Sequence, residues 1–327
     1  MKKCNERLNE QLMNVLWDEK ATPQIRLKKA KYLVELGADV NSLLFGKSAV
    51  SVAISNNDEE LVQYLKDKGG KEWEISKDES IKLGKGLLRV LRTHDWEESC
   101  NLIKKGADLE VRNEEGETAL IVASGDANAE LMELLLKRNS QTLVCDNYKI
   151  TPLIMAAWGG NKDAVEMLLK KDYDIEARDK EKKTALIRAS WRGCIEVFEM
   201  LLEKGAKIDA KDDLGQTALM WGALRGYKDA VEFLLLRGAK MELKDNGGRT
   251  ALMWGACGGN EDVVEFLIEK GANLRAKDKK GKTALEIARE HKQEKVEKIL
   301  EKAMEKESVN EKKSNGFMDI LFRGKKR

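Results

Sequence analysis

Few residues in this chain combine the type and the spacing that catalysis requires. The triplet Gly281-Lys282-Thr283 matches the last residues of a phosphate-binding loop, but Ala276 stands where that loop needs another glycine. The two histidines, His94 and His291, belong to no metal-ligand or nucleophile pattern. The motifs Gly-x-Ser-x-Gly and His-Glu-x-x-His are absent. We therefore predict that the chain is not an enzyme and holds no cofactor or metal.

The charges and the cysteines exclude further classes of function. Lysine and arginine number 59, aspartate and glutamate number 57, and the two signs are interspersed along most of the chain. A nucleic-acid surface needs basic residues gathered on one face, so we expect no nucleic-acid partner. The five cysteines include no close pair, which favours free thiols in a reducing compartment. Because no apolar run is long enough for a membrane span or a secretory signal, we expect a cytoplasmic protein.

The elements that position the side chains follow a fixed period. Six threonines, each followed by a short apolar pair, recur at intervals of 33 residues: Thr118, Thr151, Thr184, Thr217, Thr250 and Thr283. Glycines recur nine residues after four of these threonines, at Gly160, Gly193, Gly226 and Gly259. Such a period is typical of a repeat protein, in which each unit contacts only its neighbours.

One unit, from Thr217 to Arg249, shows how the sequence specifies each repeat. The hydroxyl of Thr217 can cap the first of two helices, which Gly226 ends. The second helix ends at Gly238 and has an apolar side formed by Ala230, Val231, Phe233, Leu234 and Leu235. One such pair cannot bury its apolar side alone, so neighbouring pairs must stack. We predict an all-α solenoid of stacked helix-turn-helix units with short hairpin loops.

The repeat divides the chain into five segments, according to how closely each follows the pattern. They are a degenerate N-terminal capping repeat (1–47), two divergent repeats (48–117) with an insertion near 70–84, five regular repeats (118–282), a C-terminal capping repeat (283–305) and a flexible basic tail (306–327). The pair Thr22-Pro23, which is typical of a helix start, places the first segment in phase with the others.

Two motifs make this pattern similar to the ankyrin-repeat family. Gly215-Gln216-Thr217-Ala218-Leu219 resembles the family's early Gly-x-Thr-Pro-Leu-His motif, and Gly37-Ala38-Asp39 resembles its Gly-Ala-Asp motif. The resemblance implies a scaffold that binds another protein along a concave groove of first helices and hairpin tips. The family's histidine is replaced throughout, so the hydrogen bonds that it makes between repeats must be missing or replaced. Its positions hold Ile121, Ile154, Ile187, Met220, Met253 and Glu286.

The resemblance also suggests which residues meet the partner. Trp158 and Trp191 lie at the end of their first helices, a place that faces partners in the family; packing on the next repeat's loop is the alternative. We interpret them as a binding hot spot, because tryptophan and arginine are enriched at such sites. The predicted partner-binding set, on the concave face of 118–260, is Tyr148, Ile150, Trp158, Trp191, Arg192, Leu214, Leu224, Arg225 and Arg249.

Three further residues share positions with this set or lie beside it. Trp221 and Trp254 occur one repeat apart on the first helices and point partly into the groove, and we expect them to stack between adjacent repeats. Cys257 occupies the same repeat position as Trp158, and we expect an inert thiol.

The tail supports an alternative function. Residues 317–327 place apolar side chains ahead of basic ones, a pattern that suits weak membrane contact or an address for the nucleus or a secretion machine. The chain would then be a secreted or targeted effector or regulator, acting in a host cytosol and using the repeats to read its cargo. An enzyme whose site is assembled from distant repeats is a third alternative.

Overall fold

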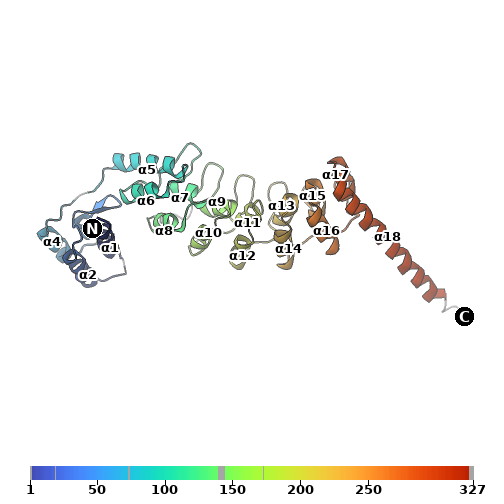
Figure 1. Cartoon of the computed structure of the whole chain (residues 1–327), viewed down its shortest axis with the longest axis horizontal. Coiled ribbons are helices and arrows are strands. Elements are labelled where there is room, and N and C mark those ends of the chain that lie inside the picture. The colour runs from blue at the N-terminus through green and yellow to red at the C-terminus, as the bar shows by residue number, and fades with distance from the viewer. Residues whose placement is uncertain (1, 19, 73, 139–143, 172, 324–327) are drawn as a thin grey trace. The chain divides into compact units, whose positions relative to one another are not determined.

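The computed structural model describes residues 2–18, 20–72, 74–138, 144–171 and 173–323, with side chains from residue 7 to residue 308 (Figure 1). These residues form eighteen helices and one two-stranded hairpin. They group into two compact units, residues 1–123 with 127–147 and residues 124–126 with 148–327. All the predicted partner-binding residues belong to the second unit.

The first unit holds the divergent repeats. Its helices are α1 (Lys2–Leu16), α2 (Pro23–Glu35), α3 (Ala49–Ser55), α4 (Glu59–Asp67), α5 (Lys77–Leu91), α6 (Trp96–Lys104), α8 (Ala129–Arg138) and all but the last residue of α7 (Ala119–Ser124). Strands β1 (Leu43–Leu44) and β2 (Lys47–Ser48) are antiparallel. Thr22 caps α2 and accepts a hydrogen bond from the N–H of Ile25, as its sequence predicted. Helix α5 begins at Lys77, so much of the expected insertion near 70–84 lies within a helix.

The second unit consists of five helix pairs in two rows (Figure 1). The first helices pack on one another in the order α9 (Pro152–Gly159), α11 (Ala185–Ala189), α13 (Ala218–Arg225), α15 (Ala251–Gly258) and α17 (Ala284–Glu290). The second helices do the same in the order α10 (Lys162–Leu169), α12 (Ile195–Glu203), α14 (Lys228–Leu236), α16 (Glu261–Glu269) and α18 (Glu294–Arg323). We call the first helices and the hairpin loops that precede them the first-helix face.

Local sequence explains where these helices begin and end. Four of the periodic threonines accept a hydrogen bond from the backbone N–H three residues later, at 3.3–3.4 Å: Thr151, Thr184, Thr217 and Thr283. Gly160, Gly226 and Gly259 end their helices with positive φ, which glycine adopts without steric cost. Between the rows lie fully buried apolar side chains such as Leu219, Val231 and Leu234. The predicted all-α solenoid is confirmed.

The C-terminal segment differs from the sequence expectation. Helix α18 continues through Arg323, whereas a flexible tail was expected from residue 306. Residues 306–315 are rich in lysine and glutamate, which have high helix propensity, so they can prolong a helix that has already begun. Side chains from residue 309 onward and the whole of residues 324–327 lie outside the described part of the chain, and so does the proposed address signal that depends on them.

Adjacent first helices approach each other closely at glycines. A Cβ atom added at Gly258 of α15 would lie 2.5 Å from the carbonyl oxygen of Leu224 in α13. By contrast, a Cβ atom at Gly86 inside α5 would meet only the Leu102 side chain, at 3.9 Å. The repeat therefore uses glycine at the end of α15 to let the backbone of its neighbour come near.

We predict opposite effects of alanine at these two glycines. Gly258→Ala should lower the free energy of unfolding by about 1–3 kcal/mol, because the neighbouring backbone must move. Gly86→Ala should raise it by about 0.5–1 kcal/mol, because alanine loses less conformational entropy in a helix. Urea unfolding followed by circular dichroism measures both variants. A Gly258→Ala variant at least as stable as the parent chain would show that the helices have room to separate.

Candidate partner-binding site

An aspartate organises each hairpin loop on the first-helix face. Asp212, five residues before the capping Thr217, accepts hydrogen bonds on Oδ1 from the N–H groups of Leu214 (3.0 Å) and Gln216 (2.8 Å). A carboxylate that bonds the backbone two residues further on forms a turn of its own. Three other loops use the same pair of bonds, from Asp179, Asp245 and Asp278.

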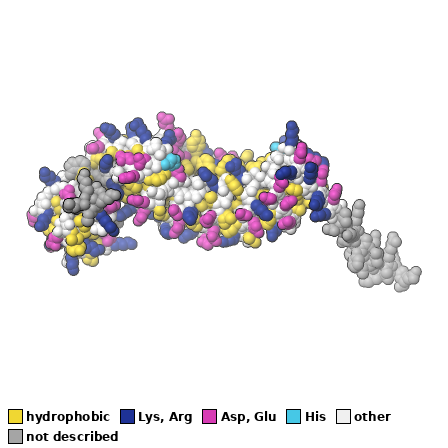
Figure 2. All heavy atoms as spheres, viewed as in Figure 1, with side chains coloured by type: hydrophobic (Ala, Val, Ile, Leu, Met, Phe, Trp, Pro, Cys, Tyr) yellow, Lys and Arg dark blue, Asp and Glu magenta, His cyan; other side chains and the backbone are white. Residues whose placement is uncertain are grey.

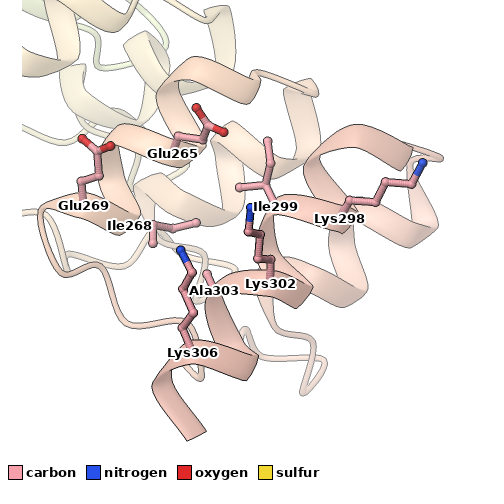
Figure 3. A pocket seen from close by; sticks show the side chains of 8 residues that line it. All are labelled: Glu265, Ile268, Glu269, Lys298, Ile299, Lys302, Ala303 and Lys306. Carbon is pink, nitrogen blue, oxygen red and sulfur yellow. The ribbon is translucent and has the colours of Figure 1, made fainter. Parts of the chain in front are cut away.

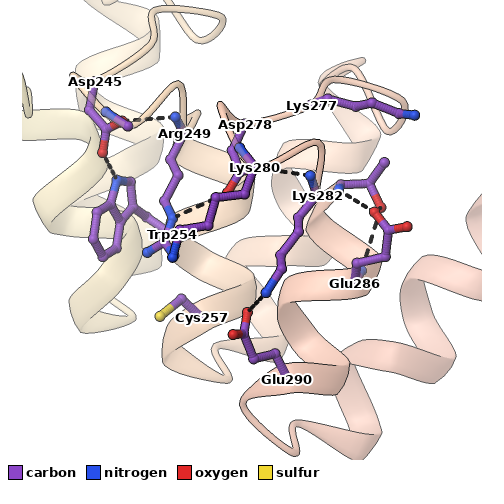
Figure 4. A network of polar contacts seen from close by, with 12 residues as sticks. Asp245, Arg249, Trp254, Cys257, Lys277, Asp278, Lys280, Lys282, Glu286 and Glu290 are labelled. Atoms are coloured by element: carbon purple, nitrogen blue, oxygen red, sulfur yellow. Dashed lines mark hydrogen bonds and ion pairs between the residues drawn. The ribbon is translucent and has the colours of Figure 1, made fainter.

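The second oxygen of these aspartates holds a side chain of the following helix. Oδ2 of Asp212 accepts the indole N–H of Trp221 at 3.0 Å, and Oδ2 of Asp245 accepts that of Trp254 at the same distance (Figure 4). In the preceding repeat the donor is Nε of Arg188, 2.7 Å from Oδ2 of Asp179. Asp179, Asp212 and Asp245 thus each shape their loop and fix the orientation of a large side chain on the first-helix face.

Cationic and aromatic side chains alternate along this face. The guanidinium carbon of Arg188 lies 4.5 Å from the ring centre of Trp158, and that of Arg225 lies 4.3 Å from the ring centre of Trp191. The rings of Trp191 and Trp221 are 5.4 Å apart and tilted by 45°. Because each of these contacts joins one repeat to the next, together they position the tryptophans relative to one another.

Backbone hydrogen bonds link the hairpin loops. The N–H groups of Lys180, Asp213, Asn246 and Lys279 donate to carbonyl oxygens of the preceding loop at 2.8–2.9 Å. Long side chains add similar links, since Nζ of Lys211 donates to the carbonyl of Lys244 at 2.7 Å. These bonds connect the repeats without the histidine. In the second unit its positions hold the exposed Glu286 and four buried side chains, Ile154, Ile187, Met220 and Met253.

The comparison with protein families decides which repeat this is. A family model described as "Ankyrin repeats (3 copies)" matches residues 94–179, 174–245 and 219–312. The chain belongs to the ankyrin-repeat family. Ankyrin repeats are generally modules of protein–protein interaction, and proteins built from them are typically non-enzymatic scaffolds. The search of curated proteins found no match.

The ankyrin first-helix face exposes most of the predicted partner-binding residues. Tyr148 and Leu214 at the hairpin tips are 56% and 57% exposed, and Trp191 is 37% exposed. Arg192 and Arg225 are exposed, while Trp158, Leu224 and Arg249 are half-buried. These residues stay a predicted site, now with a defined geometry.

The prediction that Ile150 contributes to an exposed partner-binding surface is wrong. Ile150 is only 6% exposed. It immediately precedes the capping Thr151, and the equivalent residues Lys183 and Gln216 of the next two repeats are also buried. In these three repeats the residue before the threonine is buried, so the Ile150 side chain cannot serve as part of an apolar surface patch.

Sequence analysis left Arg188, Lys183 and the loop aspartates out of the site. Arg188 lies over Trp158, and Nζ of Lys183 lies 4.9 Å from the ring centre of Trp221. The aspartates do carry a sequence signal, because they recur every 33 residues, five before each periodic threonine except Thr118, which has Asn113 there. No sequence signal showed that their second oxygens would bond tryptophan or arginine.

The expected stacking of the other two tryptophans is realised for one of them. Trp221 contacts Trp191 of the preceding ankyrin repeat. Trp254 contacts the loop that precedes its helix: its indole N–H donates to Asp245, and the guanidinium carbon of Arg249 lies 5.0 Å from its ring centre (Figure 4). Trp254 therefore braces its own hairpin.

Cys257 lies at the same face, next to the C-terminal ankyrin repeat. Its sulfur is 3.5 Å from Nε2 of His291, and burial raises the pKa of the thiol. A raised pKa reduces the thiolate fraction, which is the reactive form. Among the described residues, no three His, Cys, Asp or Glu side chains are grouped to hold a metal ion.

A cavity of about 560 Å³ lies elsewhere, between the second helices α16 and α18 (Figure 3). Its apolar floor is formed by Ile268, Ile299 and Ala303. Charged side chains surround that floor: Glu265, Glu269, Lys298, Lys302 and Lys306. It contains no aromatic anchor, so the first-helix face is the stronger binding candidate. None of the described helices combines the length and apolarity needed to cross a bilayer.

We predict that Asp212 stabilises its ankyrin repeat. Asp212→Ala should lower the free energy of unfolding by about 1–3 kcal/mol, because it removes the acceptors of two backbone N–H groups and of the Trp221 indole. Asp213→Ala, at an exposed side chain in the same loop, is the matched control and should change the stability by less than about 0.5 kcal/mol. Urea unfolding followed by tryptophan fluorescence compares the two. Equal free energies of unfolding for the two variants would mean that the hydrogen bonds of Asp212 do not stabilise the fold.

Proposed function

We propose that the chain is a scaffold that binds another protein through the first-helix face of residues 148–260. The observation that carries this proposal is the position of Trp191, a large side chain that is 37% exposed although Arg225 and Trp221 contact its ring. An aromatic side chain held in place before binding loses little conformational entropy when a partner covers it.

The surroundings of Trp191 have the composition of a binding site. Apolar tips at Tyr148 and Leu214 and the half-buried Leu224 add contact area, and Arg192 and Arg225 supply exposed charges. A central apolar anchor with a polar rim is the usual arrangement of protein interfaces. Trp158, half-buried beneath Arg188, extends the anchor into the preceding repeat.

The alternative of a targeted effector depends on residues 306–327. Helix α18 includes most of that segment, but its side chains from residue 309 onward lie outside the described part of the chain. The first-helix face, in contrast, offers exposed apolar area, charge and fixed geometry in one place. We therefore favour partner binding as the activity of the repeats, whatever the address of the protein.

Replacing the anchors should abolish most of the binding. Affinity purification from the source cells with mass spectrometry identifies the partner, and isothermal titration calorimetry then measures its affinity. Each of Trp158→Ala and Trp191→Ala should weaken binding by about 2–4 kcal/mol, because hot-spot residues contribute that much. The matched control is Leu236→Ala, which removes the most exposed large apolar side chain in α14 on the second-helix row. If the Trp158→Ala/Trp191→Ala variant folds and binds like the parent chain, the first-helix face is not the binding site.

A further inference from the structure

Charge is divided between the two helix rows of the second unit. The second helices α10, α12, α14 and α16 carry eleven carboxylates and two lysines, a net charge of −9. The first helices α9, α11, α13 and α15 carry no carboxylate and two arginines, Arg188 and Arg225. Acidic and basic side chains are intermixed over the face drawn in Figure 2, so the division becomes clear only when charges are sorted by helix row.

The hairpin loops strengthen the positive character of the first-helix face. Their exposed charged side chains are mostly lysines: Lys149, Lys180, Lys182, Lys279 and Lys280. The exposed carboxylates of the same loops are Glu181 and Asp213, and Glu181 is already paired with Lys183. A surface of this kind attracts segments of negative charge and repels positive ones.

Arg192 and Arg225 differ from the other cations near the tryptophans. Arg188 is paired with Asp179, and Nε of Arg249 lies 3.8 Å from a carboxylate oxygen of Asp278. Within the described part of the chain, no carboxylate lies within 4 Å of the guanidinium groups of Arg192 or Arg225. Both are exposed, and Arg225 is held over the ring of Trp191. Both guanidinium groups can donate hydrogen bonds to a partner, and the contact with the Trp191 ring fixes the position of the Arg225 group.

We infer that the partner is an acidic protein segment whose carboxylates pair with Arg192 and Arg225 while an adjacent apolar residue covers Trp191. This inference rests on the proposed binding function of the first-helix face. A guanidinium group binds a carboxylate with two parallel hydrogen bonds, which gives the pairing a defined direction. The acidic segment needs few carboxylates, because the exposed lysines of the hairpin loops add to the positive charge that attracts it.

The repeat sets the spacing of those carboxylates. Arg192 and Arg225 occupy equivalent positions one repeat apart, and packed helices are separated by about 8–10 Å. Residues three apart in an extended segment are separated by about 10 Å, and residues seven apart in a helix by about 10.5 Å. The partner should therefore carry Asp or Glu at one of these two spacings.

A nucleic acid would share the negative charge but fits the face less well. Base stacking requires open aromatic faces. Arg225 and Trp221 already contact the ring of Trp191, and Arg188 lies over that of Trp158. The exposed apolar side chain of Leu214 on the same face also favours an apolar amino acid over a sugar or phosphate.

Peptide selection tests this inference on the full-length chain. A library of random 16-residue peptides is displayed on phage and selected for binding to the immobilised chain. Only peptides that do not bind the Trp191→Ala variant are then analysed. We expect those peptides to be enriched in Asp and Glu at spacings of three or seven residues. The affinity of a synthetic enriched peptide, measured by fluorescence anisotropy, should fall about tenfold in Arg192→Gln/Arg225→Gln. It should also weaken as NaCl rises from about 50 to 500 mM.

Controls separate charge from folding and from the parent proposal. Lys162→Gln/Lys228→Gln makes the same change of charge on the second helices and should bind within twofold of the parent chain. Arg192→Gln alone should still lose several-fold in affinity. Three results would overturn the inference of an acidic partner and leave the proposed binding function standing. The Trp191-dependent peptides could lack acidic enrichment, or the arginine variants could bind with unchanged affinity. Single-stranded oligonucleotides could also displace the peptide at lower concentration than acidic peptides do. If no selected peptide depends on Trp191, the proposed function fails as well.

Discussion

Each 33-residue helix pair has an apolar side that only its neighbour can cover, and this constraint shapes the second unit. The first helices are short and rich in alanine and glycine, so adjacent backbones come close enough that a Cβ atom at Gly258 would collide with α13. The buried faces of the second helices fill the space between the rows. Stability in such an array comes from contacts between neighbours, and the side away from them stays available for a partner.

The loop aspartates couple this stacking to the geometry of the surface. One carboxylate oxygen defines the turn, and the other orients Arg188, Trp221 or Trp254 on the helix that follows. Cation–π and aromatic contacts then carry that order from repeat to repeat. The family's histidine is absent, and backbone bonds between successive hairpins link the repeats in its place. A surface fixed in this way can bind a partner without first paying a large cost in entropy.

The near-neutral charge of the chain conceals an uneven distribution. Carboxylates gather on the second helices, where solvent covers them, and cations gather on the first helices and the loops. The arrangement gives the first-helix face a positive charge although the net charge of the whole protein is close to zero. Long-range attraction can therefore act on a partner at that face, while the acidic row disfavours non-specific contact with polyanions.

The sequence by itself determined the repeat and much of its local structure. The period of 33 residues, the capping threonines and the terminating glycines predicted the helices and the family, because caps and turns depend on a few neighbouring residues. Tertiary structure decided the rest. Ile150 is buried, as are Lys183 and Gln216 at the same position, whereas Arg249 at that position is half-buried, and no local pattern reveals this difference. Contacts such as that of Arg225 with Trp191 depend on which side chains of adjacent repeats meet. Those contacts join residues about 33 positions apart, and their geometry exists only once the repeats have stacked.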